Sequence, residues 1–382
     1  MVRTLARCAS HFETQTRKTL QMTAGTELST LVAEVERVDR AKRDFLVDSR
    51  KVSVLPSGRE LLLGGADIGP VSIRPYAHGQ LAEFTGIPKR YYDRMLNEAP
   101  DLLAANTNRW LSQEGKRRMI RTVDDECRAF LSNSYRVVDN LDFLHAVLPA
   151  LEKAQVRIES VQFSETKLYL KAVMHGREEL ILPPGARMGE GHSTFHRVRP
   201  GIVISNSEVG AGAYAVQPAI YDTGCTNLAV SRKDAMRKYH VGRRQGGEGD
   251  DSLEIKSDRT RALEDASSLS HMADLVESAL DGSVFERFCN SLRESLGQPI
   301  EKPVAETVEL VRERFGFSEG ESSQILDALV RSNDLTRHGL HAAVTRFSQD
   351  VEDYQRATEL ELVGGDILEM PKTAWAALAL RN

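Results

Sequence analysis

Histidines and one cysteine in the middle of the chain are the residues most suited to metal chemistry. His192 and His196 stand four positions apart in the segment HSTFH, and Cys225 and His240 follow downstream. Two histidines at this spacing bind zinc when they share one face of a helix and a third ligand lies nearby. Glycines and a proline flank the segment, however, which disfavours a helix. We therefore expect no metal and no cofactor, and these four residues are the candidate ligands if a metal is found.

Nucleophilic catalysis has weaker support in the sequence. The chain contains no GxSxG elbow, no P-loop and no GxGxxG motif after a predicted strand. Cys127 follows three acidic residues, whose negative charge disfavours a reactive thiolate, whereas Cys225 lies nearer to basic residues. The candidate site for an enzyme of unknown reaction is a polar group at predicted strand ends: Asn206, Ser207, Glu208, Cys225 and Asn227. For its first three residues, the competing interpretation is a capped turn that closes a strand.

Clusters of lysine and arginine give the strongest functional signal. The first cluster falls at the start of a predicted strand and contains Lys116, Arg117, Arg118 and Arg121. The second falls within thirteen residues and contains Arg232, Lys233, Arg237, Lys238, Arg243 and Arg244. Such clusters neutralise phosphates without reading base sequence, and if 231–239 is helical, Lys233 and Arg237 share one face. The competing interpretation is a solvated basic face that contacts the acidic C-terminal region of the same chain.

The net charge of −5 conceals a division along the chain. Residues 245–382 contain 14 Lys and Arg against 27 Asp and Glu, a net charge of −13. The remaining residues, 1–244, contain 36 basic and 28 acidic side chains, a net charge of +8. This division favours one region that faces a polyanion and another that repels it.

Composition places the chain among ordinary globular proteins. With 382 residues it can bury one large core or two smaller ones, and apolar residues at 41% and charged residues at 27% argue against wholesale disorder. No apolar run reaches the ~18 residues of a membrane helix, and no apolar block follows the N-terminal basic residues as in a signal peptide. Four widely spaced cysteines without a CxxC pair favour reduced thiols. We therefore expect a cytoplasmic protein.

The elements expected to position these residues form an α+β pattern. After a frayed or disordered segment, 1–25, apolar spacing of three and four predicts helices, and short alternating runs predict strands. The helices expected before residue 245 span 27–38, 76–84, 89–96 and 141–153, the last with Asn140 as its N-cap. The strands expected there span 45–55, 60–63, 118–123, 128–131, 136–138, 156–163, 168–174, 201–205 and 213–221. We expect one domain over 26–244, with a mostly antiparallel sheet, flanking helices and a basic surface.

A glycine-rich acidic segment, 245–252, has the composition of a linker. An acidic helical region is expected beyond it, over 253–382. Its helices are expected at 262–280, 284–296, 304–315, 319–331, 337–350 and 351–363. Gly316 and the pair Gly364 and Gly365 stand where helix C-caps would fall.

Several segments are similar to a known family. They are QLAEFTGIPKRYYDRML (80–96), RAFLSNSYRVVDN (128–140), ISNSEVGAGAYAVQPAIYDTGCTN (204–227), KYHVGRR (238–244) and HGLHAAVTRFSQDVEDYQRATELELVGGDIL (338–368). In these segments the chain resembles the phage/plasmid-like family built on domain of unknown function 932. The resemblance covers most of the chain from 28 onward and implies a mobile genetic element as the setting. The family has no established activity.

Together these observations predict a phage- or plasmid-encoded protein that binds nucleic acid. By analogy with other mobile-element proteins, single-stranded DNA is the favoured ligand, in a single-strand-binding or annealing role during recombination or replication. We expect no catalytic residues and no membrane association, and a homo-oligomer is a possible assembly. Two alternatives remain open. One is the enzyme with the polar site described above, and the other is a regulatory protein that binds a host factor through its acidic helices.

Overall fold

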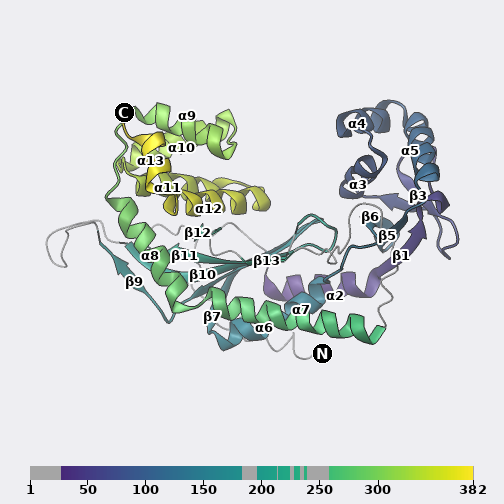
Figure 1. The fold of residues 1–382 in the computed structure, drawn as a ribbon, viewed down its shortest axis with the longest axis horizontal. Coiled ribbons are helices and arrows are strands. Elements are labelled where there is room, and N and C mark those ends of the chain that lie inside the picture. The colour runs from purple at the N-terminus through teal and green to yellow at the C-terminus, as the bar shows by residue number, and fades with distance from the viewer. Residues whose placement is uncertain are drawn as a thin grey trace.

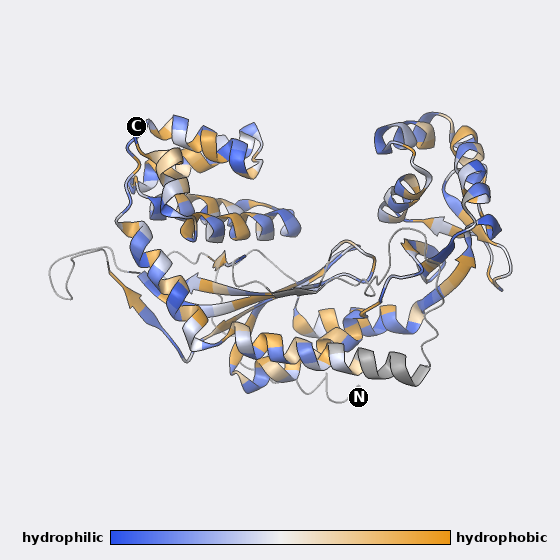
Figure 2. Cartoon of the chain, in the orientation of Figure 1, coloured by the Kyte–Doolittle hydropathy of each residue, from blue (hydrophilic) through white to orange (hydrophobic). Residues whose placement is uncertain are grey.

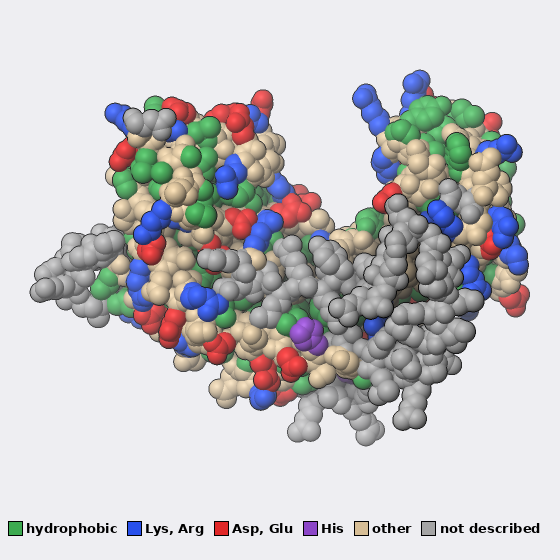
Figure 3. Space-filling model, in the orientation of Figure 1, with side chains coloured by type: hydrophobic (Ala, Val, Ile, Leu, Met, Phe, Trp, Pro, Cys, Tyr) green, Lys and Arg blue, Asp and Glu red, His purple; other side chains and the backbone are tan. Residues whose placement is uncertain are grey.

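A computed structural model of the chain describes residues 27–182, 196–212, 214–223, 228–232, 236–238 and 258–381. Figure 1 shows three parts: an N-terminal unit of sheet and helices, a central sheet with helices on one face, and a C-terminal helical bundle. The N-terminal unit and the bundle rise on the same side of the central sheet, and Figure 3 shows the surface hollowed between them. The expected α+β fold, with mostly antiparallel sheets and a helical C-terminal region, is confirmed. None of the described helices is long and apolar enough to cross a membrane.

The N-terminal unit, residues 42–132, is a six-stranded sheet packed against helices. The strand order is β1-β5-β6-β4-β3-β2, and the described pairs are antiparallel except β4 with β6. Its strands are β1 (Lys42–Asp48), β2 (Val52–Val54), β3 (Glu60–Leu63), β4 (Val71–Ile73), β5 (Arg117–Val123) and β6 (Glu126–Ser132), and its helices are α3 (Pro75–Thr85), α4 (Lys89–Glu98) and α5 (Pro100–Glu114). Apolar side chains between the two layers, among them Leu61, Leu81 and Ile120, are fully buried.

The sequence predicts one strand over 45–55, whereas the structure has β1 and β2 with a 3-10 turn, η1 (Ser49–Lys51), between them. The turn forms because the Asp48 carboxylate accepts a hydrogen bond from the backbone N–H of Arg50 at 2.9 Å, which competes with sheet pairing. Helix α5 is not predicted either. Its large apolar residues Leu102 and Trp110 stay exposed, so its sequence lacks a clear apolar stripe.

The central sheet has the strand order β12-β11-β10-β8-β7, with β13 paired to β11 and β9 paired to β10. All of these described pairs are antiparallel. The strands are β7 (Val156–Phe163), β8 (Leu168–Met174), β9 (Glu179–Ile181), β10 (His196–Asn206), β11 (Tyr214–Asp222), β12 (Leu228–Val230) and β13 (Met236–Lys238). The hairpin predicted over 156–163 and 168–174 is confirmed as β7 and β8, whereas 136–138 forms no strand.

Three helices cover one face of the central sheet in the described part of the chain: α2 (Leu28–Ala41), α6 (Asn140–Lys153) and α7 (Asp258–Ala279). Their buried residues, such as Val35, Leu148 and Met272, share one core with Leu170 of β8. The expected linker 245–252 lies outside the described residues. Because α7 packs beside α6, the acidic region begins inside the core of the central sheet rather than beyond it.

Helix α6 begins one residue earlier than predicted, so its N-cap position belongs to Asp139 and not to Asn140. The Asn140 side chain instead accepts a hydrogen bond from the Asn206 amide at 2.8 Å. The predicted cap is therefore wrong, because a partner from β10 takes the side chain that would have capped the helix.

The remaining helices form the C-terminal bundle and its connection to the sheet. They are α8 (Gly282–Leu296), α9 (Val304–Phe315), α10 (Glu319–Ser332), α11 (Arg337–Phe347), α12 (Tyr354–Leu368) and α13 (Lys372–Ala379). Helix α8 packs on the central sheet, where Phe285 and Phe288 contact Val198 and Ile220. Helices α9 to α13 enclose a separate core around the buried Trp375. Figure 2 shows both hydrophobic and hydrophilic residues on each bundle helix, as expected of amphipathic helices that bury one face.

Two glycines allow α12 to lie directly on the central sheet. Gly364 and Gly365 are inside α12, so the prediction that they form a C-cap is wrong, whereas Gly316 is confirmed as the left-handed C-cap of α9. A Cβ atom on Gly365 would lie 1.9 Å from the carbonyl oxygen of Val230 in β12. The close approach of helix and strand therefore requires glycine at this position.

A buried ion pair also joins the bundle to the sheet. Lys171 of β8 has no exposed surface, and its ammonium lies 2.7 and 2.8 Å from the two carboxylate oxygens of Glu361 in α12. Next to it, the hydroxyls of Ser160 and Tyr354 are 2.7 Å apart. Burial raises the pKa of Glu361, and the charge of Lys171 opposes that effect. The ion pair places two charges in the interior, where each depends on the other.

Candidate nucleic-acid interface

Two residues of the second basic cluster, Arg237 and Lys238, lie in a strand of the central sheet and not in a helix. In β13, Arg237 lies opposite Ala215 of β11, and Lys238 lies opposite Tyr214. Figure 1 shows β13 beneath the hollow between the bundle and the N-terminal unit. The interpretation of 231–239 as a helix is therefore wrong for 236–238, since the backbone of β13 pairs with the free edge of β11 beside β12. The backbone of two residues of the second basic cluster is therefore part of the central sheet.

A further cation, Lys167, lies at the end of the sheet where β11 starts and β13 pairs with it. Lys167 closes the turn between β7 and β8, and its Nζ atom is 5.9 Å from the centre of the Tyr169 ring. A Cβ atom on Gly212, in the turn before β11, would lie 3.6 Å from the Lys167 side chain. The two hairpin turns therefore meet close to the start of β11, where β13 pairs. Sequence reasoning missed Lys167, and its place in a predicted hairpin turn was the available signal.

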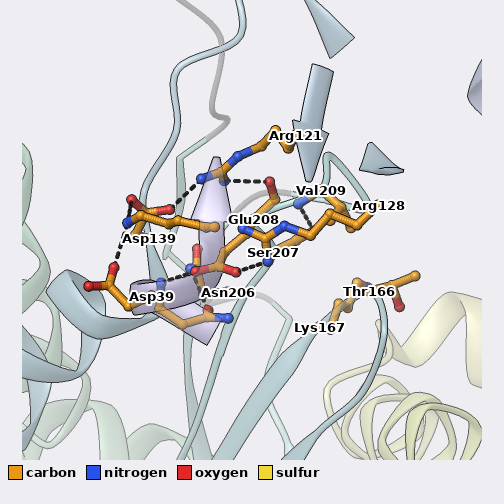
Figure 4. A network of polar contacts seen from close by, with 12 residues as sticks. Asp39, Arg121, Arg128, Asp139, Thr166, Lys167, Asn206, Ser207, Glu208 and Val209 are labelled. Carbon is orange, nitrogen blue, oxygen red and sulfur yellow. Dashed lines mark hydrogen bonds and ion pairs between the residues drawn. The ribbon is translucent and has the colours of Figure 1, made fainter. Parts of the chain in front are cut away.

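A polar network fixes the turn after β10 to the N-terminal unit (Figure 4). One carboxylate oxygen of Glu208 lies 2.5 Å from the Arg128 guanidinium, and the other accepts a hydrogen bond from the backbone N–H of Asn140 at 2.6 Å. Both Glu208 and Arg128 are about 95% buried, with side-chain exposures of 5% and 4%. The turn after β10 and the N-terminal unit are therefore held in a fixed position relative to each other.

Arg121 belongs to this network and not to a nucleic-acid surface. It is fully buried, and its guanidinium contacts Asp44 at 2.8 Å, Asp139 at 2.7 Å and the backbone carbonyl of Glu208 at 2.9 Å. Burial alone would raise the pKa of Asp139, but the charges of Arg121 and Lys42 hold it below its usual range. The predicted role of Arg121 is corrected, because a guanidinium enclosed by carboxylates has no surface left for a phosphate.

The alternative polar site is likewise committed to internal bonds where the structure describes it. The Asn206 amide donates to the carbonyl of Val138 at 2.9 Å, and the Ser207 hydroxyl accepts from the backbone N–H of Ala211 at 2.9 Å. With Glu208 bound as described above, these groups close the strand and anchor its turn, which agrees with the capped-turn interpretation. Cys225 and Asn227 lie outside the described residues.

The other predicted cations that the structure describes lie in different parts of the fold. Lys116 and Arg117 are exposed at the start of β5, whereas the Arg118 guanidinium lies 3.8 Å from the centre of the Phe84 ring. Arg232 forms an ion pair with Asp366 of α12 at 2.9 Å. The remaining predicted cations, Lys233, Arg243 and Arg244, lie outside the described residues. The first cluster therefore belongs to the N-terminal unit and the second to the central sheet, and the described residues do not join them into one surface.

Of the residues considered for a metal, the structure describes one. His192, Cys225 and His240 lie outside the described residues, while His196 is the first residue of β10. There it contacts Asp222 and His338, neither of which sequence reasoning selected. The spacing of His338 and His341 on a predicted helix was the available signal. The expectation of a protein without metal stays a prediction.

Comparison of the chain with family models, with curated proteins and with solved structures finds no match. The resemblance to the phage/plasmid-like family therefore stays a prediction.

Proposed function

We propose that the protein binds single-stranded nucleic acid in the hollow between the N-terminal unit and the bundle, as an accessory factor of phage or plasmid recombination or replication. The observation that supports this proposal is the position of β13. The basic run 232–244 enters the central sheet at this strand, beside the turn that contains Lys167. Arginine and lysine side chains at this position would neutralise backbone phosphates without reading bases.

The net negative charge of the bundle would help to guide a polyanion toward β13. Residues 304–381, which hold α9 to α13, contain 14 Asp and Glu against 8 Lys and Arg. A polyanion that enters the hollow is repelled by the bundle and attracted by the basic run, so electrostatics guide it toward β13. The effect weakens with salt, because the Debye length is about 8 Å at physiological ionic strength.

The test is the affinity of the full chain for a short fluorescent single strand, measured by anisotropy at several salt concentrations. The variant Arg237→Glu with Lys238→Glu should bind much more weakly. Its plot of log affinity against log salt should be shallower by about 1.4, because each phosphate contact contributes roughly 0.7 on single strands. The backbone pairs of β13 do not depend on these side chains, so circular dichroism should remain unchanged.

A matched control separates local contacts from total charge. Arg331→Glu with Lys372→Glu changes the net charge by the same amount, at two side chains of the bundle that are 78% and 76% exposed. This control should leave the salt slope unchanged. Equal losses in both variants, or undetectable binding of the unmodified protein at low salt, would refute the proposal. Deletion of 245–382 cannot serve as a test, since it removes α7 from the core of the central sheet.

A further inference from the structure

Three side chains with metal-binding chemistry meet where the bundle touches the end of the central sheet. His196 is the first residue of β10, Asp222 is the last of β11, and His338 is the second of α11. The register of β10 and β11 places Val198 opposite Asp222, so His196 lies two residues further along on the same face of the sheet. One potential ligand atom from each of the three side chains lies within 4.8 Å of the others.

The three groups are compact and shielded from solvent. The Nδ1 atom of His196 lies 2.6 Å from a carboxylate oxygen of Asp222, and the rings of His196 and His338 are 4.3 Å apart between centres. The side chains of His196 and Asp222 are each 12% exposed, and that of His338 is 6% exposed. Two imidazoles and a carboxylate in a shielded site create an environment that favours a cation.

Asp334 orients the histidine of the bundle. Its carboxylate lies 2.8 Å from Nδ1 of His338, and because a carboxylate accepts, Nδ1 carries the proton and the lone pair is on Nε2. The Thr336 hydroxyl donates to the same carboxylate at 2.6 Å and caps α11 by accepting from the Gly339 N–H at 3.2 Å. Burial alone would raise the pKa of Asp334, but these hydrogen bonds hold it below its usual range. A carboxylate that fixes a histidine in this way is typical of the second shell of metal sites.

His341, one turn along α11, adds no positive charge to the cluster. Its Nδ1 lies 3.0 Å from the carbonyl oxygen of Gly364, so that nitrogen carries the proton. Burial lowers the pKa of His341 to about 3, and the ring is therefore neutral near pH 7. A neutral neighbour does not oppose a divalent ion.

We propose that His196, Asp222 and His338 bind one divalent transition-metal ion and that Asp334 is the positioning residue of this site. Imidazole together with carboxylate suits Zn²⁺, Fe²⁺, Co²⁺ and Mn²⁺, whereas Mg²⁺ and Ca²⁺ are bound mainly through oxygen ligands. Three protein ligands are also the number that catalytic zinc sites use, with water or substrate in the remaining position. The site is separate from β13, which pairs with the start of β11, whereas Asp222 is the last residue of β11.

The test uses the full chain after removal of metals with a chelator. Titration with Co²⁺, followed by visible absorption and calorimetry, should show one ion per chain. An ion concentration 100 times Kd should raise the Tm by about 3 °C for a chain of 382 residues. His338→Ala and Asp222→Asn should each weaken binding by more than ~100-fold, and Asp334→Asn by roughly 10- to 100-fold, the range for losing an outer-shell partner.

His271→Ala is the matched control, because His271 is exposed on α7. It should bind Co²⁺ like the unmodified protein. The proposal is overturned if the unmodified chain binds no ion. It is also overturned if binding survives in His338→Ala and Asp222→Asn, or if these variants have lost their fold and Asp334→Asn, with native circular dichroism, binds as tightly as the unmodified chain.

Discussion

Replacing Lys171 with methionine should destabilise the protein by an amount that depends strongly on pH. The ammonium of Lys171 is fully buried against the Glu361 carboxylate, which is 4% exposed. Methionine keeps the approximate length of the side chain and removes the charge, so Glu361 is left buried without its partner. Breaking a buried pair in this way costs about 3–5 kcal/mol.

The magnitude follows from proton uptake by Glu361. Burial raises the pKa of this carboxyl, and without Lys171 the side chain should stay protonated in the folded state at pH 7. In the unfolded chain the same group ionises near pH 4.3, so keeping it protonated at pH 7 costs about 3.7 kcal/mol, at 1.36 kcal/mol per pH unit. The folded pKa is the raised one, so stability is retained below pH ~4.3 and lost as the pH rises. At pH 5 the same calculation gives about 1 kcal/mol.

The assay is urea denaturation followed by far-ultraviolet circular dichroism at pH 5 and pH 7. The difference in unfolding free energy between Lys171→Met and the unmodified protein should be three to four times larger at pH 7 than at pH 5. The double variant Lys171→Met with Glu361→Leu should recover most of the loss, because it leaves no charge unpaired. A deficit that is the same at both pH values would show that the loss has another cause, and the reasoning would be refuted.

The remaining predictions concern other contacts of the fold. Gly365→Ala should lower stability by at least ~1–3 kcal/mol and shift α12, because its Cβ would lie 1.9 Å from the Val230 carbonyl oxygen, and thermal denaturation measures the loss. Glu208→Ala should cost about 3–5 kcal/mol, because it leaves the buried Arg128 guanidinium without its carboxylate, and urea denaturation measures this. In His341→Gln, the free energy of unfolding should decrease less with falling pH than it does in the unmodified protein. The pKa of His341 is lowered to about 3, so the unmodified protein loses up to about 1.4 kcal/mol per pH unit as the pH falls below ~6.5, as a denaturation series across pH would show.

The sequence predicts elements well where the pattern is local. The β7 and β8 hairpin is predicted with its observed bounds, since alternating side chains and a short polar turn lie within twenty residues. Prediction fails where a distant partner decides the outcome. In the sequence, the two glycines of α12 predict a helix end. They lie inside the helix because β12 packs too close to it for a side chain at Gly365, and the sequence does not reveal that contact.

The candidate sites show the same limit. A basic residue in a cluster gives no sign of whether it faces solvent, so Arg121 is indistinguishable in sequence from Arg117, although one is fully buried and the other exposed. The metal-site proposal joins residues 26 positions apart on two strands with a third from the bundle. No local spacing connects His338 to them, because only the packing of α11 against the end of the sheet brings it there.

The path of the chain through the central sheet makes the N-terminal unit an insertion in another domain. Helix α2 and helix α6 belong to one core, and the whole of 42–132 lies between them in sequence. The two ends of the insertion meet, since the Lys42 ammonium forms an ion pair with the Asp139 carboxylate. A unit whose ends are adjacent can be exchanged for another through short connections, provided that the new unit supplies partners for the carboxylates of Glu208 and Asp139. The fold therefore offers a natural position for grafting, at which one inserted module can be replaced by another while the rest of the protein is retained.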